Sequence, residues 1–180
     1  MNLRNSDYNY GVITKLFHWI MAIIIIGMIV LGQYMPDLEV GPQKQSLYRL
    51  HKSFGTLILI LVAFRILWRA RNITPALPAN TSRFERLGAN ASHYALYFLM
   101  VYMPIVGWLM SSAAGSPVSF FGIFTLPNLV SANKELMGLF KDMHAIGGNL
   151  FIAVIGLHFA AGLFHHFYKK DDVLKKMLPF

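Results

Sequence analysis

Histidines inside long apolar runs are the residues of this chain best suited to chemistry. His18, His51, His93, His144 and His158 lie within such runs or at their ends. Ionisable side chains are costly at membrane depth, so they usually serve a function there. His144 and His158 are 14 residues apart. On a helix this spacing returns to within about 40° of the same face and advances about 21 Å, so one helix presents two imidazoles at two depths.

Each of these two imidazoles has a candidate partner on another segment. Alternating helix directions bring His51 to the same side of the membrane as His144, and His18 to the same side as His158. Two histidine pairs at different depths of a helical bundle are the arrangement that bis-histidine ligation of two stacked b-type haems requires. His165 would match the depth of His18 better, but we favour His158 for its inward face and for the small residue that follows it one turn later.

Small residues follow all four proposed ligands at a spacing of one turn, namely Ala22, Gly55, Gly148 and Gly162. A flat macrocycle beside a helix needs space about one turn from its ligand, and small side chains leave that space. The residues at the same spacing from His93 and His165 are the larger Tyr97 and Lys169. The pattern therefore favours the four proposed ligands over the other histidines.

The segments that carry these histidines are expected to span a membrane. Of the 180 residues, 56% are hydrophobic and 13% are charged, whereas a soluble domain has about 25% charged residues. About 20 apolar residues cross the hydrocarbon, and the pattern predicts spans at about residues 16–35, 47–68, 87–110 and 140–168. The remaining loops are too short to fold alone. We therefore expect residues 1–180 to form one all-α domain, an integral membrane four-helix bundle.

The positions of the charged residues and the absence of cysteine further limit the topology and the cofactors that this membrane protein can have. Leaving out Arg65, which lies inside a span, ten Lys and Arg lie on the side of the termini and five on the other side. The positive-inside rule then predicts both termini in the cytoplasm. The net charge of +8 comes from span ends rather than from one patch, which argues against nucleic acid as a partner. The absence of cysteine excludes cysteine-ligated iron–sulfur clusters and covalently attached c-type haem.

Four stretches carry a resemblance to a known family: YGVITKLFHW at residues 10–19, LHKSFG at 50–55, FRILWR at 64–69 and HFAAGLFHHFYKKDDVLKKM at 158–177. In them the chain resembles the bacterial cytochrome b561 proteins, four-span di-haem b proteins of the inner membrane. The resemblance covers nearly the whole chain and implies His18, His51, His144 and His158 as axial haem ligands. Some members look like superoxide oxidases that pass electrons to ubiquinone, and others serve different electron donors.

The resemblance implies two haem b groups but does not fix the substrate. We expect an oxidoreductase that oxidises superoxide, the leading donor, on the periplasmic side and reduces ubiquinone. Arg49 and Lys52 flank His51, and Lys141 lies one turn before His144. These cations would pair the propionates of the outer haem and attract a small anion such as superoxide. The external loop also contains the apolar stretch Phe120–Phe124, which we expect in the membrane interface.

At the other side, Arg65 follows His51 by 14 residues and would reach a propionate of the inner haem or the quinone. Quinone reduction needs protons, which imidazole supplies near neutral pH. His165 shares the face of His158 and is the first candidate for this role, and His93 is the second.

Three alternative functions remain. A cytochrome b subunit that relays electrons for a periplasmic redox protein would use the same ligands and differ in its partner. A non-haem di-metal oxygenase would need its histidines clustered on one side, whereas these are divided between the leaflets. A small transporter would be expected to have a carboxylate well inside the membrane or paired broken helices. The sequence shows neither, because the one carboxylate within the predicted spans, Asp142, lies at the very start of the last one.

Overall fold

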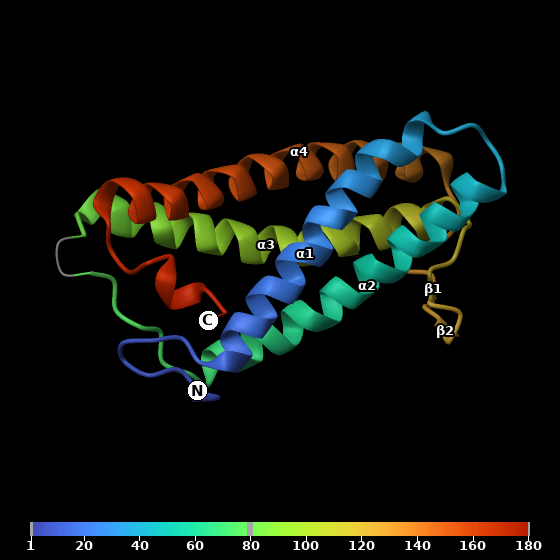
Figure 1. Ribbon diagram of the computed structural model, residues 1–180. Helices are drawn as coiled ribbons and strands as arrows, with labels where there is room; N and C mark the ends of the chain where they lie inside the picture. Colours follow the sequence, from blue (N-terminus) through green and yellow to red (C-terminus); the bar gives the residue numbers. More distant parts are fainter. Residues whose placement is uncertain (1, 79–80, 180) are drawn as a thin grey trace.

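The computed structural model describes residues 2–78 and 81–179. In this part of the chain, four long helices run up and down in sequence order, with both termini at one end of the bundle (Figure 1). They are α1 (Val12–Tyr34), α2 (Pro42–Ala70), α3 (Arg83–Ala113) and α4 (Lys134–Phe164). We call the end with the termini the inner end and the opposite end the outer end. All four helices are long and apolar enough to cross a membrane, which confirms the predicted all-α membrane bundle.

Local signals set the helix ends beyond the predicted spans. The α3 helix begins with a capping box, in which the Ser82 hydroxyl accepts the Glu85 N–H and the Glu85 carboxylate accepts the Ser82 N–H. Asn133 caps α4 by accepting two backbone N–H groups of its first turn. At 31 residues, α3 is about 46 Å long, against about 30 Å of hydrocarbon. The polar turns at its ends therefore reach the headgroup region. An apolar run in the sequence does not extend that far, so it cannot predict where the helix ends.

A short hairpin between α3 and α4 packs against α2. Its strands β1 (Ser119–Phe120) and β2 (Phe124–Thr125) pair antiparallel. Ser53 of α2 holds the hairpin, because its hydroxyl lies 2.8 Å from the carbonyl of Ser119 and accepts the N–H of Phe121 at 3.1 Å. The hairpin projects sideways from the outer part of the bundle (Figure 1), with Ile123 76% exposed at its tip.

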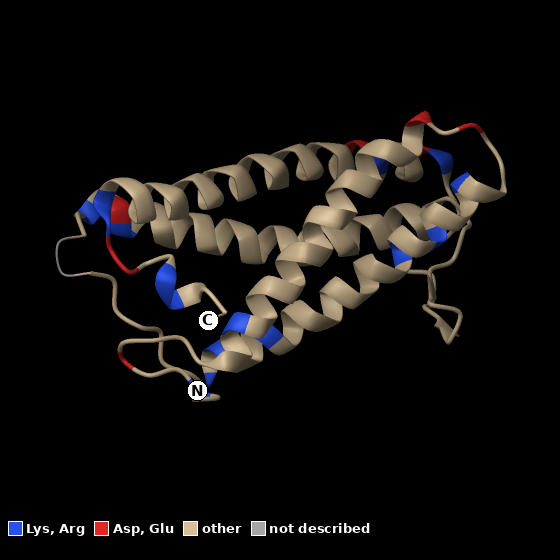
Figure 2. Cartoon of the chain, in the orientation of Figure 1, with Lys and Arg blue, Asp and Glu red and all other residues tan. Residues whose placement is uncertain are grey.

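The hydrophobic core lies midway between the two ends and receives side chains from every helix: Met21, Ile25, Ile58, Val62, Leu99, Met100 and Phe151. Lys, Arg, Asp and Glu gather toward the two ends and leave the middle of the bundle without charge (Figure 2). Many large apolar side chains on the outside of the helices are exposed, such as Ile23 and Leu157. This distribution suits a bundle surrounded by lipid.

Candidate haem-binding site

Two histidine pairs form between facing helices, one at each end of the core. In the outer pair, His51 of α2 and His144 of α4 have ring centroids 6.3 Å apart. In the inner pair, His18 of α1 and His158 of α4 have centroids 6.2 Å apart. With metal–nitrogen bonds of about 2.0–2.1 Å and about 1.1 Å from nitrogen to ring centre, an ion between two imidazoles holds their centroids roughly 6.3 Å apart. Both pairs fit bis-histidine ligation of one iron.

Unsatisfied ring nitrogens support the same fit. The Nδ1 atoms of three proposed ligands, His18, His51 and His144, and of His166 are buried and have no hydrogen-bond partner among the described residues, whereas His158 does not share this feature. Buried polar atoms are normally paired, since an unpaired one costs about 1–3 kcal/mol. These rings therefore have bonding capacity that the described residues do not use and that a haem iron could use. Because His166 shares this feature and His158 does not, the centroid separations rather than the unpaired nitrogens select the proposed ligands.

The two pairs belong to a repeat that runs through all four helices. Positions 14 residues apart define an outer layer of Gly32, His51, Gly107 and His144 and an inner layer of His18, Arg65, His93 and His158. The position midway between them, seven residues from each, is buried and apolar on every helix: Ile25, Ile58, Met100 and Phe151. Seven residues make nearly two helical turns, so the three positions of each helix share one face. An apolar layer thus separates the two histidine pairs.

Two glycines lie beside the outer pair, and one of them makes room for its histidine. A Cβ added to Gly32 would lie 3.5 Å from Cε1 of His51, and one added to Gly107 would lie 3.2 Å from Cε1 of His144. The second distance is shorter than an ordinary carbon–carbon contact of about 3.5–4.0 Å. Gly107 therefore allows the His144 ring to lie directly on the backbone of α3.

The small residues predicted beside the ligands face various neighbours. A Cβ on Gly55 or Gly148 would come within 4.0 Å of Met28 and 3.7 Å of Met103, respectively. Gly162 instead faces Leu174 of the C-terminal segment, at 3.9 Å from an added Cβ. Each of these is an ordinary contact, and the role of these positions in admitting a macrocycle stays a prediction.

His93 of α3 joins the inner pair as a third imidazole. Its ring centroid lies 5.5 Å from that of His158, with the planes at 60°. This separation is too short for an ion between the rings, whereas the 6.2 Å between His18 and His158 is suitable. The geometry therefore favours His18 as the partner of His158 and leaves His93 as a neighbour.

Arg65 enters the inner layer from α2 and is held by protein groups. Its Nε donates to the hydroxyl of Tyr97 at 3.2 Å, and its guanidinium lies 5.6 Å from the centre of that ring. A longer contact of 3.5 Å joins its Nη1 to the carbonyl of Phe17, the residue before His18. Arg65 thus links α1, α2 and α3 at the depth of the inner pair. Its contact with a propionate or a quinone stays a prediction.

Lys52 fastens the loop between α3 and α4 beside the outer pair. Its Nζ lies within 3.3 Å of four oxygens, from Ser111, Ser116 and Pro117. These partners are hydroxyl and carbonyl groups, so they leave its positive charge unneutralised. Arg49 and Lys141, the other predicted cations of this end, have exposed side chains.

His165 lies where α4 changes into a π-helical turn, His165–Lys169. Its Nδ1 is 2.6 Å from Oδ2 of Asp171, an arrangement that orients the ring and leaves Nε2 available. Partial burial raises the pKa of Asp171, but the hydrogen bonds from His165 and from the N–H of Val173 outweigh it, and the pKa lies below its ordinary value. The following segment folds back over the inner end, where the carbonyl of Met177 accepts the Trp19 indole N–H.

The di-metal alternative finds no support in the geometry. Within residues 2–78 and 81–179, no group of three or more His, Asp or Glu side chains is placed to hold a metal ion. The proposed ligands come together as pairs from different helices instead.

Sequence reasoning missed Gly32, Gly107 and the contact of His93 with His158. The signal was present in the spacing. The 14-residue interval recognised on α2 and α4 also relates His18 to Gly32 and His93 to Gly107. A glycine has no side chain that could do chemistry, so its role is visible only when the neighbouring residue in the structure is known.

Comparison with known proteins identifies the family of the chain. The model of the prokaryotic cytochrome b561 family matches residues 9–180. Cytochrome b561 homolog 2 of Escherichia coli (strain K12) is 36% identical over 179 residues, which cover 99% of this chain and 95% of that protein. The probable superoxide oxidase CybB of Yersinia pestis is 32% identical over 165 residues, covering 90% and 91% of the two chains. The resemblance seen in the sequence is confirmed: the chain belongs to the prokaryotic cytochrome b561 family, haem b proteins that transfer electrons in the bacterial inner membrane.

Proposed function

We propose that the protein holds two haem b groups and carries electrons from superoxide at its outer end to ubiquinone at its inner end. His51 and His144 would hold the outer haem, and His18 and His158 would hold the inner haem. The observation that carries the proposal is the pair of centroid separations, 6.3 and 6.2 Å, in two layers of one bundle.

When bound, each haem supplies a one-electron iron couple, and the protein supplies its ligands and surroundings. The histidines fix the two depths, and Gly107 lets the His144 ring approach the backbone. The apolar middle layer, with Phe151 at its place on α4, keeps water out of the space between the layers. Arg65 adds a positive charge to the inner layer, which favours reduced over oxidised states of a nearby centre.

At the outer end, positive charge favours an anionic donor. Arg49 and Lys141 are exposed there, and Lys52 keeps its charge among neutral oxygens. Such a cluster raises the local concentration of a small anion. The name of the Yersinia pestis relative supports superoxide in this role. Each superoxide anion gives one electron and becomes O₂.

At the inner end, ubiquinone takes up two electrons and two protons. The His165–Asp171 pair is a suitable proton donor, because the carboxylate orients the ring through Nδ1 and leaves the opposite nitrogen for a quinone oxygen. The excess of Lys and Arg on this side supports a cytoplasmic position of both termini. Protons for the quinone would then come from the cytoplasm.

The absorption spectrum and pyridine haemochrome of the purified protein test this proposal. We expect two non-covalent b haems per chain, with His51→Ala and His144→Ala each losing the outer haem and His18→Ala and His158→Ala each losing the inner one. His165→Ala is the matched control and should keep both haems. A chain without haem, or a His165→Ala variant that loses a haem while His158→Ala keeps two, would contradict the assignment.

A further inference from the structure

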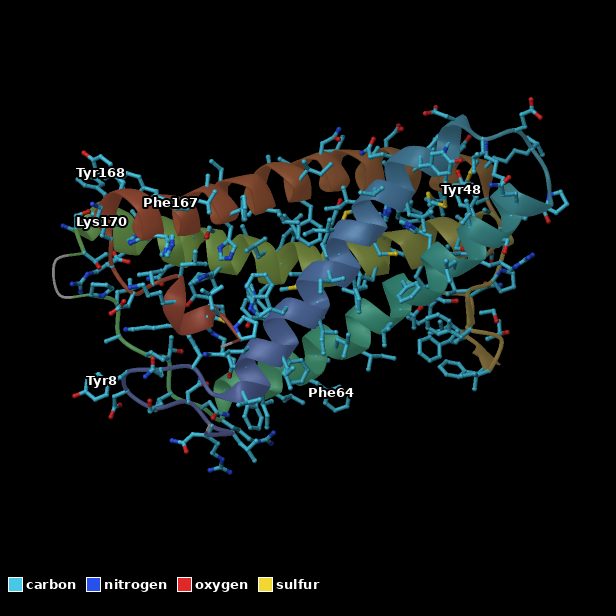
Figure 3. All side chains as sticks on the ribbon, in the orientation of Figure 1. Tyr8, Tyr48, Phe64, Phe167, Tyr168 and Lys170 are labelled. Atoms are coloured by element: carbon cyan, nitrogen blue, oxygen red, sulfur yellow. The ribbon has the colours of Figure 1, made fainter. Side chains whose placement is uncertain are left out.

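A groove between α1 and α2 at the inner end lies outside the histidine layers. It contains a cavity of about 210 Å³ whose walls are the apolar side chains of Phe17, Phe64, Leu67 and Trp68. Phe64 points away from the bundle on the outside of α2 (Figure 3) and is 58% exposed. The cavity is smaller than the usual 300–1,000 Å³ of a site that encloses a small molecule. It suits one part of a longer ligand that continues along the lipid-facing surface.

Two arginines also line this cavity. Arg4 comes from the segment before α1, and Arg71 follows directly after α2. Arg4 also lines a second cavity of about 260 Å³, whose other walls include Lys15, Asn9 and Tyr10. Burial raises the pKa of Tyr10 despite the opposing effect of nearby arginines, so its hydroxyl is a neutral donor at neutral pH. The apolar cavity thus adjoins a polar, cationic one.

The cations have no acidic partner in the described chain. Across residues 2–78 and 81–179, no Asp or Glu lines either cavity, and Arg4, Lys15 and Arg71 form no ion pair. Unpaired arginines beside a hydrophobic groove are suited to an anion that carries its own apolar part.

Packing fixes Arg4 in this position. A Cβ on Gly11 would collide with the backbone of Leu3 and Arg4, so only glycine permits this approach. The neighbouring Asn5 holds the segment through three hydrogen bonds, accepting the N–H of Gly11 and the hydroxyl of Thr14 and donating to the carbonyl of Ile73. The site is therefore built by the fold rather than by a free terminal tail.

We propose that this groove binds an anionic phospholipid of the leaflet at which both termini lie. The phosphate lies between Arg4 and Arg71, the headgroup occupies the polar cavity beside Lys15, and an acyl chain runs over Phe17 and Phe64. The depths of these residues support this placement of the phosphate and the acyl chain. Arg4 and Arg71 lie beyond the ends of α1 and α2, at the height of the headgroups. Phe17 and Phe64 lie one to two helical turns further into the membrane. A neutral quinone would use the apolar wall and gain little from the guanidinium groups.

Native mass spectrometry of the purified, haem-loaded protein tests the site, with dioleoylphosphatidylglycerol and dioleoylphosphatidylcholine as probes. The unmodified protein is expected to bind the anionic lipid at least tenfold more tightly. Arg4→Gln and Arg71→Gln should each weaken its binding about fivefold, as expected for one basic residue at an anionic membrane surface. Arg83→Gln, which removes the same charge at the start of α3, should change it less than twofold.

A second variant separates position from charge. Gly11→Ala displaces Arg4 without altering any charge, and it should weaken binding of the anionic lipid while the absorption spectrum of the haems stays unchanged. Equal affinity of the unmodified protein for the two lipids would overturn the proposal, and this measurement needs no variant to fold. An equal loss in Arg83→Gln would show general charge attraction, and displacement of the lipid by a soluble ubiquinone analogue would show a quinone site.

Discussion

The contact between Gly107 and His144 provides a sharp test of the layered site. A Cβ at position 107 would lie 3.2 Å from Cε1 and 3.5 Å from Nδ1 of the His144 ring. Ordinary carbon contacts begin at about 3.5 Å, so Gly107→Ala must move the ring by roughly 0.3 Å or more. Overpacking of this kind costs about 1–3 kcal/mol. We take the lower end, about 1 kcal/mol, because the ring turns more easily than backbone, and this corresponds to about fivefold weaker binding of the outer haem.

Gly32→Ala is the matched control for this change. It adds the same methyl group opposite the other ring of the same pair, at 3.5 Å from Cε1 of His51, where contact is ordinary. Both substitutions replace a helical glycine with alanine, so the gain in helix propensity, up to about 1 kcal/mol, is shared. Differences between the two variants therefore report the contact with the ring.

Haem titration of the apoprotein and low-temperature electron paramagnetic resonance measure the outcome. We expect Gly107→Ala to weaken the outer haem about fivefold and shift its low-spin signal, with the inner haem unchanged. Gly32→Ala should leave both haems within about twofold of the unmodified protein. Equal effects of the two variants, or no effect of Gly107→Ala, would refute the reasoning that Gly107 positions a ligand.

The two ends of the bundle offer further tests. Arg49→Gln should slow haem reduction by superoxide and flatten its ionic-strength dependence, because screening acts beyond about 10 Å at 0.1 M salt. His165→Ala should keep both haems reducible but slow their reoxidation by ubiquinone at least about tenfold in stopped-flow absorbance. Because the pKa of Asp171 is lowered in the folded protein, its ionised carboxylate stabilises the fold at pH above its unfolded-state pKa of about 3.9. This stability is lost as the pH falls through the lower pKa of the folded state. The protection of the backbone amides of residues 170–179 against hydrogen exchange, relative to the intrinsic rate at each pH, should therefore fall below about pH 4. In the hairpin, Ile123→Cys should resist a membrane-impermeant maleimide, since we expect this tip in the membrane interface.

Matched variants accompany these measurements. Arg83→Gln removes a cation at the inner end and should leave the superoxide rate unchanged. Asp171→Asn should slow quinone reduction less than His165→Ala, because it removes the orienting carboxylate and leaves the ring. Asn128→Cys, an exposed polar position of the same loop, should label readily in a chain without other cysteines. A superoxide rate indifferent to salt would favour electron relay from a docked protein, and equal labelling of the two cysteines would place the hairpin in water.

The fold was predictable because the composition of each segment shows whether it can span a membrane. Long apolar runs bounded by charge identify each helix, and lipid leaves the backbone little alternative to helix formation. The ends were not predictable from the same signal. Ser82 and Asn133 cap helices several residues outside the apolar runs, and the hairpin on Ser53 depends on contacts 66–68 residues apart in sequence. No local pattern reports such a contact.

The histidine pairing was predictable for a different reason. A spacing of 14 residues fixes both face and depth, so two positions on α4 select their partners on α1 and α2. The contacts of the other basic residues were harder to predict from the sequence. Lys52 bonds to loop oxygens and His165 to Asp171, and both partners belong to segments whose path does not follow from periodicity.

The apolar middle layer bears on how the two ends are coupled. Its positions on the four helices carry Ile25, Ile58, Met100 and Phe151, none of which donates or accepts a proton. Electrons can tunnel across such a layer, whereas a proton needs a chain of polar groups or water. Charge would therefore cross the bundle as electrons alone. Under the proposed function, the protons for ubiquinone would then enter from the end at which it is reduced, the end where the His165–Asp171 pair lies.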